Sequence, residues 1–168
     1  MKKLLVLCIF LSISAGLYAQ VGNVFDDFFL SAGPELNANT REGAAIGGSV
    51  IFGTDFLKIF AGGLRVIISN NFGEITTIEP LLFFRFYPPL GIKGLFAQLE
   101  LGASLFLEGG GVYPAFSAGL SAGWRFSLTE KFYIEPYIRG GYPFAWGIGI
   151  TAGIFLPIKI RSNSGGDQ

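Results

Sequence analysis

Apolar residues alternate with small or polar residues along most of the chain. In the segment 145–158 every second residue from Trp146 to Ile158 is apolar, and the positions between them hold three glycines, Thr151, Phe155 and Pro157. Successive side chains of a β-strand point to opposite faces, which gives this period of two. The uncharged stretch 140–158 is long enough for a transmembrane helix, but its glycines and prolines favour a strand with one apolar face.

The same alternation recurs seven more times, most regularly between residues 95 and 142. Turn sequences rich in Gly, Asn and Pro separate the segments, such as Asn70-Asn71-Phe72-Gly73 and Gly109-Gly110-Gly111. Connections this short join antiparallel hairpins. The pattern therefore predicts eight strands, at residues 28–37, 43–53, 58–69, 75–87, 95–107, 116–127, 132–142 and 145–158.

An even number of strands of about ten residues, each apolar on one face, is typical of proteins that cross a membrane as a closed sheet. Closure removes the unpaired strand edges, to which lipid offers no hydrogen bonds. We therefore predict an all-β fold, an eight-stranded antiparallel up-and-down transmembrane β-barrel with short loops on both sides. The alternative is a soluble eight-stranded barrel or sandwich of the lipocalin type with its apolar face inward. Its exterior would be rich in Gly and Ser and unusually poor in charge.

Composition agrees with a membrane protein. The chain is 51% apolar, 15% aromatic and only 14% charged, whereas soluble domains are about a quarter charged. Aromatic residues gather near the two ends of the predicted strands, as in the interfacial girdles of membrane barrels. One predicted girdle holds Phe28, Phe52, Phe60, Phe84, Phe86, Phe96, Trp124, Phe126 and Phe132, and the other holds Tyr113, Phe116, Tyr142 and Trp146.

The charged residues inside the predicted strands fall on the face opposite the apolar one. Hairpin register is expected to place Arg65 opposite Glu79 and Arg125 opposite Glu135. An eight-stranded barrel is just wide enough for side chains, so we predict a lumen ion-pair network in two neutral layers. We interpret it as the packing of a polar lumen, and the alternative is a gate or proton path. The outer layer is expected to hold Glu35, Arg65, Glu79 and Arg139, and the periplasmic layer Arg85, Glu100, Arg125 and Glu135.

The start of the chain has the features of a secretory signal peptide. Lys2 and Lys3 precede an apolar stretch, and Leu17-Tyr18-Ala19 fits a cleavage site. We predict a signal peptide at residues 1–19, cleaved near Ala19, an outer-membrane β-barrel at 20–161 and a short polar tail at 162–168. Cys8 is the single cysteine and lies in the apolar stretch, so the exported chain would have neither Cys nor His.

These missing residue types exclude most catalytic chemistry. A Ser-His-Asp triad, a Cys nucleophile and the usual zinc sites all need His or Cys. Glu79, Glu100 and Glu135 each have an Arg that is expected to keep them ionised, which argues against acid-base catalysis. Twelve basic residues balance twelve acidic ones, so nucleic acid is not an expected partner. We predict no enzymatic activity, no cofactor and no metal.

The architecture resembles the small eight-stranded outer-membrane barrels of the OmpA transmembrane-domain and OmpW type. Its short loops and glycine-rich strands are most similar to the minimal versions of spirochaetes and related diderm bacteria. The resemblance covers essentially all of the mature chain and includes a barrel-assembly signal in the last strand. That signal is a polar residue, a glycine two positions later, and hydrophobic residues three and five after the glycine. It is matched by Thr151, Gly153, Leu156 and Ile158, although the family usually ends on an aromatic residue and here residues 159–168 follow.

The resemblance implies a monomer in the cell outer membrane whose partners are outer-membrane lipid, the barrel-assembly machinery and periplasmic chaperones. We predict a structural or membrane-integrity barrel with a lumen plugged by Glu/Arg pairs. The alternative is a narrow channel or conduit for small or hydrophobic solutes, as is proposed for OmpW-like barrels. A surface receptor or adhesin comes third, because the outer connections are too short to build a large binding face.

Overall fold

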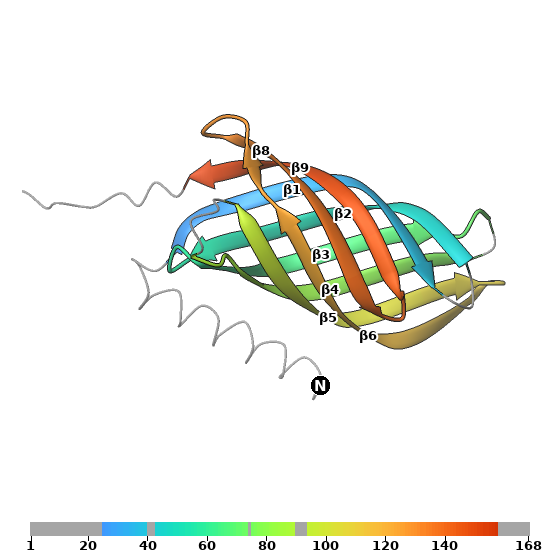
Figure 1. Ribbon diagram of the computed structural model, residues 1–168. Coiled ribbons are helices and arrows are strands. Elements are labelled where there is room, and N and C mark those ends of the chain that lie inside the picture. Colours follow the sequence, from blue (N-terminus) through green and yellow to red (C-terminus); the bar gives the residue numbers. More distant parts are fainter. Residues whose placement is uncertain (1–24, 40–42, 74, 90–93, 158–168) are drawn as a thin grey trace, which may run out of the picture.

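The computed structural model describes residues 25–39, 43–73, 75–89 and 94–157. The predicted signal peptide at 1–19, the tail at 162–168 and Ile158 lie outside these described residues. Among the residues described, no helix is long and apolar enough to cross a membrane. The described chain is built from antiparallel strands joined mostly by short turns (Figure 1).

The strands follow the predicted alternation with small changes at their ends. They are β1 (Phe25–Asn39), β2 (Gly43–Phe56), β3 (Phe60–Asn70), β4 (Thr76–Phe86), β5 (Leu95–Glu108), β6 (Gly111–Trp124), β7 (Phe126–Ser127), β8 (Phe132–Tyr142) and β9 (Trp146–Pro157). β6 and β7 are two parts of one predicted strand, interrupted at Arg125. Each of the eight predicted strands is therefore present.

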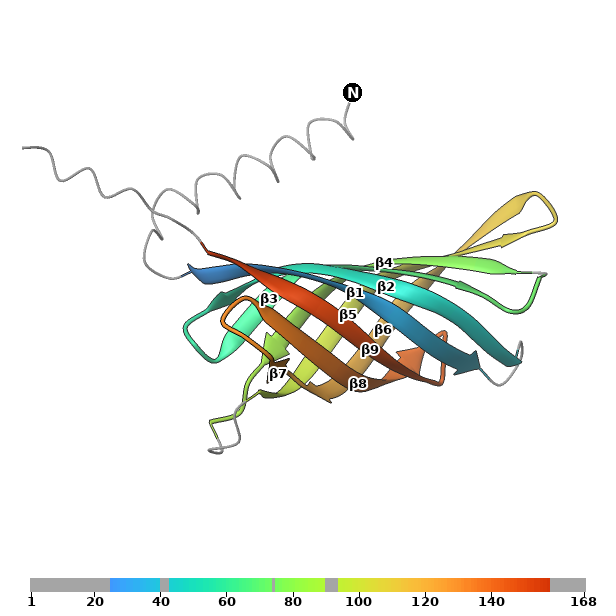
Figure 2. The same cartoon turned by 90° about the horizontal axis from the view of Figure 1, so that it is seen from above.

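The sheet closes on itself. Strands β1 to β5 each pair with the next strand along the chain, β6 and β7 both pair with β8, β8 pairs with β9, and β9 pairs with β1. The result is the predicted closed eight-stranded antiparallel barrel. Figures 1 and 2 show that the start of β1 and the end of β9 lie at the same end of the barrel, which we call the proximal end. The opposite end is the distal end, where the β5–β6 hairpin reaches furthest in Figure 2.

One predicted strand register is wrong by two residues. Arg65 lies opposite Leu81, and Glu79 lies opposite Ile67. The prediction centred the β3–β4 turn on residue 72, whereas the backbone NH of Asn71 bonds to the carbonyl of Ile75 and the turn is centred on residue 73. That shift of one residue at the turn moves every facing pair by two positions.

The barrel has its apolar face outside. Leu82, Leu120 and Ile138 are more than 60% exposed, and the polar face of each strand points into the lumen. The soluble alternative, with bulky apolar residues inside, is therefore wrong. Eight of the thirteen predicted girdle aromatics, such as Phe132 and Trp146, are exposed on the outer surface. Phe96 is an exception, because it lies on the inward face of β5 and is 2% exposed.

Candidate functional site: the lumen network

The eight charged residues predicted to face the lumen all do so. Each is at least nine-tenths buried, and together with Asp55, which is only partly exposed, they form two clusters. Buried charges are stable only when they are paired and hydrogen-bonded. The geometry of the two clusters therefore determines whether the lumen is sealed or open.

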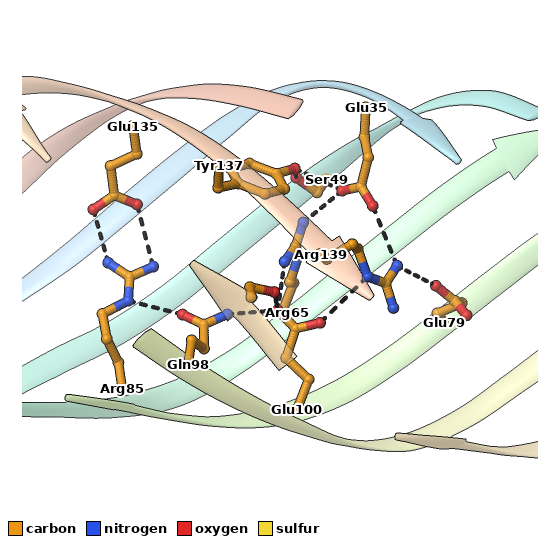
Figure 3. Close-up of polar contacts among 11 residues, drawn as sticks. Glu35, Ser49, Arg65, Glu79, Arg85, Gln98, Glu100, Glu135, Tyr137 and Arg139 are labelled. Carbon is orange, nitrogen blue, oxygen red and sulfur yellow. Dashed lines mark hydrogen bonds and ion pairs between the residues drawn. The ribbon is translucent and has the colours of Figure 1, made fainter. Parts of the chain in front are cut away.

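The distal cluster contains three carboxylates and two guanidinium groups (Figure 3). Arg65 donates from Nη2 to Glu35 Oε2 and from Nη1 to Glu100 Oε1, both at 2.5 Å. Arg139 Nη1 donates to Glu79 Oε2 at 2.8 Å and to Glu35 Oε1 at 3.2 Å, and its Nε lies 3.5 Å from Glu100 Oε2. Each guanidinium thus joins carboxylates from different strands across the lumen.

Hydroxyl groups complete the coordination of the distal carboxylates. Every carboxylate accepts one hydrogen bond from a neighbouring hydroxyl, and charge-assisted bonds of this kind are stronger than neutral ones. The donors are Tyr137 to Glu35 at 2.6 Å, Ser104 to Glu79 at 2.6 Å, and Ser121 to Glu100 at 2.7 Å.

The proximal cluster is built around Glu135. Arg85 donates from Nη1 and Nη2 to the two oxygens of Glu135, at 2.7 and 3.2 Å. Arg125 donates from Nε to Glu135 Oε1 and from Nη1 to Asp55 Oδ2, the latter at 3.1 Å. Asp55 also accepts a bond from Tyr87 Oη at 3.2 Å. Burial raises the pKa of Tyr87 to about 12, so this phenol stays protonated and able to donate.

Gln98 connects the two clusters. Its side-chain oxygen accepts from Arg85 Nε at 2.8 Å, and its amide nitrogen donates to Glu100 Oε1 at 2.6 Å (Figure 3). An amide has one acceptor side and one donor side. It can therefore satisfy a cation and an anion at once, and the network runs unbroken from Asp55 to Glu79.

The two layers differ from the prediction in membership. Glu100 belongs to the distal cluster through Arg65, not to the periplasmic layer. Arg65 and Glu79 form no ion pair in the described structure, whereas the predicted pair of Arg125 and Glu135 is confirmed. Asp55 lies beyond the predicted strand 43–53, but β2 continues to Phe56, which keeps Asp55 on the inward face with Ile51 and Gly53. The proximal cluster is neutral, and the distal cluster has three carboxylates for two arginines.

Aromatic rings fill the space around the proximal charges. The guanidinium carbon of Arg85 lies 3.9 Å from the ring centre of Phe96, and that of Arg125 lies 4.4 Å from Phe29 and 4.5 Å from Tyr133. Cations over ring faces are stabilised by the ring quadrupole, most strongly where water is excluded. The proximal arginines are thus packed among aromatic rings.

The distal lumen is closed by phenylalanine. Phe144, in the turn between β8 and β9, is 4% exposed, and its ring centre lies 6.4 Å from that of Phe106. The glycines of β9 make room for the other large inward groups. A Cβ on Gly149 would lie 2.3 Å from Tyr137 Oη, and one on Gly153 would lie 2.2 Å from Tyr133 Cζ. These tyrosine rings lie directly over glycine backbone.

The predicted assembly signal lies partly within the described chain. Thr151 is buried in the lumen beside Gly153, and Leu156 is exposed on the outer face. Ile158 lies outside the described residues, and recognition of this segment stays a prediction. Over the described ranges, no group of three or more His, Cys, Asp and Glu side chains is placed to hold a metal ion.

Comparison with known proteins identifies the architecture. No protein-family model and no curated protein matches the chain. Among solved structures, Neisserial surface protein A (NspA) is 14% identical with a TM-score of 0.54, covering 78% of this chain and 97% of its own. The outer membrane protein OprG of Pseudomonas aeruginosa is 10% identical with a TM-score of 0.56, covering 80% and 98%. The N-terminal β-barrel domain of OprF from the same organism is 15% identical with a TM-score of 0.53, covering 79% and 99%.

The fold is that of the small eight-stranded outer-membrane β-barrels. The resemblance predicted from the sequence is therefore confirmed at the level of architecture. In outer-membrane barrels an apolar band faces lipid and the interior is polar. This fold therefore accounts for the apolar outer surface and the charged lumen of this chain. The closer similarity to spirochaete versions stays a prediction.

Proposed function

We propose that this protein is a non-catalytic structural barrel of the outer membrane, exported by its signal peptide and sealed across its lumen. The observation that carries the proposal is the unbroken chain of side-chain contacts from Asp55 to Glu79. Every carboxylate in it faces at least one arginine. An arginine stays charged at any physiological pH, so the network supplies no free acid-base group, and its contacts cross a lumen that is just wide enough for side chains.

The exposed surface supports the membrane location. Large apolar side chains such as Leu82 and Leu120 lie on the outside of the sheet at exposures of 65% and 67%. Apolar surface of this extent around a whole barrel is unfavourable in water. In lipid it is the surface that an outer-membrane barrel needs.

Electrical recording tests the sealed lumen. The refolded chain is inserted into planar bilayers, and its folded state is verified by faster gel migration before heating than after. We expect no steady conductance, because Arg85, Gln98 and Arg65 occupy the cross-section. Steady, reproducible channels from the folded protein would contradict the sealed lumen and favour the narrow-conduit alternative.

A further inference from the structure

A cavity of about 640 Å³ opens at the proximal end of the barrel, beside the interruption between β6 and β7. We call it the proximal notch. The backbone NH of Arg125 bonds to the carbonyl of Gly94 at 2.7 Å, and within the described chain no strand pairs with the other edge of β7. The residues that give the notch its chemistry are Asp55, Lys58, Tyr87, Trp124, Arg125 and Phe126.

The polar side of the notch has an excess of positive charge. Lys58 is exposed, and it has no ion pair with any residue that the structure describes. Arg125 uses Nη1 on Asp55 and Nε on Glu135, whereas its Nη2 has no hydrogen-bond partner in the described chain. Among the described residues that line the cavity, two are cations and one is a carboxylate, a net charge of about +1 that favours an anion.

The other side of the notch is apolar and continues onto the lipid-facing surface. Trp124 stacks on Phe126 with ring centres 5.8 Å apart and planes 11° apart. Phe126 is 46% exposed on the outer face of the barrel. A molecule in the notch would therefore contact charged groups at one end and aromatic rings at the other, which is the chemistry of an anionic amphiphile.

The β2–β3 turn holds the lysine beside the notch in an unfavourable conformation. Leu57 and Lys58 have φ values of 52° and 62°, in the left-handed region that residues with a Cβ seldom adopt. The turn presents an apolar and a cationic side chain next to each other at the edge of the barrel. A lysine at the edge of an apolar surface covers it with its aliphatic stem and keeps its charged end in the polar surroundings.

We propose that the proximal notch binds the phosphate headgroup of an anionic phospholipid. Lys58 and Arg125 face the phosphate, and Trp124 and Phe126 contact the start of the acyl chain. The inference rests on the proposed membrane location but not on the sealed lumen. A phosphate group could also come from solution, so the two sources are separated by experiment.

Tryptophan fluorescence gives a local test. The chain has two tryptophans, so Trp146→Phe leaves Trp124 as the single reporter inside the notch. This protein is refolded in phosphatidylcholine vesicles that contain either brominated phosphatidylglycerol or brominated phosphatidylcholine. We expect the anionic lipid to quench Trp124 at about fivefold lower mole fraction, the preference that one lysine near a lipid surface provides.

Two lysine variants test whether the preference for the anionic lipid comes from the notch. Lys58→Gln should remove the preference for phosphatidylglycerol, because it removes the unpaired cation of the notch. Lys131→Gln is the matched control, since Lys131 is exposed on the β7–β8 turn at the same end and does not line the notch. Circular dichroism verifies that both variants fold. If both variants lose the preference for phosphatidylglycerol equally, the preference comes from general attraction between lysines and an anionic surface, and the proposal would be overturned.

The quenching results also test the proposed lipid site. Equal quenching by the two brominated lipids would overturn lipid binding in the notch while still showing a membrane-embedded barrel. Absence of quenching by both lipids would instead contradict the proposed membrane location. We expect inorganic phosphate added to the vesicles to leave the lipid preference unchanged. If inorganic phosphate abolishes it, the notch takes free phosphate and the lipid assignment is wrong.

Discussion

Arg125, the residue between the end of β6 and the start of β7, donates a hydrogen bond from Nε to Glu135 Oε1. Glu135 also accepts two bonds from Arg85. One fully buried carboxylate thus serves two arginines, and Asp55 neutralises the second of them. The interruption of the strand and the proximal charge cluster are therefore the same local feature.

Replacing Glu135 by glutamine should strongly destabilise the barrel. The substitution keeps the shape of the side chain but leaves the buried Arg85 without its carboxylate partner, whereas Arg125 keeps only Asp55. Breaking a buried pair in this way costs about 3–5 kcal/mol. Urea titration of the refolded protein in lipid vesicles measures the free energy of unfolding. Glu130→Gln, on the exposed β7–β8 turn, is the control and should change it by less than about 0.5 kcal/mol.

Exchanging the charges of the pair should fail to restore stability. In the double variant Arg125→Glu with Glu135→Arg, the new glutamate lies beside Asp55 and the new arginine lies beside Arg85. Like charges at these distances repel, so the double variant should be no more stable than Arg125→Glu alone. The comparison is a double-mutant cycle measured by the same urea titrations. Recovery of most of the lost stability would show that Arg125 and Glu135 form an isolated pair.

Local alternation was enough to predict the strands, the closed sheet and the inward position of the eight charged residues inside the predicted strands. Partners across the lumen could not be predicted in the same way. Glu35 and Arg65 lie on strands that are not neighbours, β1 and β3, and their contact depends on barrel radius and strand tilt. Asp55 was missed for a local reason, because Gly53-Thr54-Asp55 has the composition of a turn. Its odd-numbered position, in phase with Ile51, was the signal that could have placed it inside.

The glycines of β9 illustrate the same limit. Their spacing predicted a face of small residues, but the sequence does not say what covers them. In the structure Tyr133 and Tyr137 lie over Gly153 and Gly149. The register of β8 and β9, Tyr133 with Gly153 and Tyr137 with Gly149, pairs each large ring with a residue that has no side chain. This arrangement allows a narrow barrel to hold both rings.

Gly153→Ala should therefore destabilise the barrel, although alanine loses less backbone entropy on folding than glycine does. Its Cβ would lie 2.2 Å from Tyr133 Cζ and 2.7 Å from Ser31 Cβ, and such overpacking costs about 1–3 kcal/mol. Gly140→Ala on β8 is the control, because its Cβ has no neighbour nearer than 3.5 Å. The control should be neutral or more stable by up to about 1 kcal/mol. Equal free energies of unfolding for the two variants would show that Tyr133 can move away from Gly153.

An arginine on the outer surface distinguishes a barrel in lipid from one in water. Leu82 is 65% exposed near the middle of β4, opposite Leu64 and Leu101 on the neighbouring strands. Leu128 is 62% exposed, but it lies on the β7–β8 turn. In a membrane, Leu82→Arg should cost about 2–4 kcal/mol, and Leu128→Arg about 0–1 kcal/mol, because the cost of a charge falls from the bilayer midplane to the interface. Urea titrations in vesicles measure both. Equal, small changes would mean that the surface around Leu82 meets water, and the membrane-spanning interpretation of this barrel would be wrong.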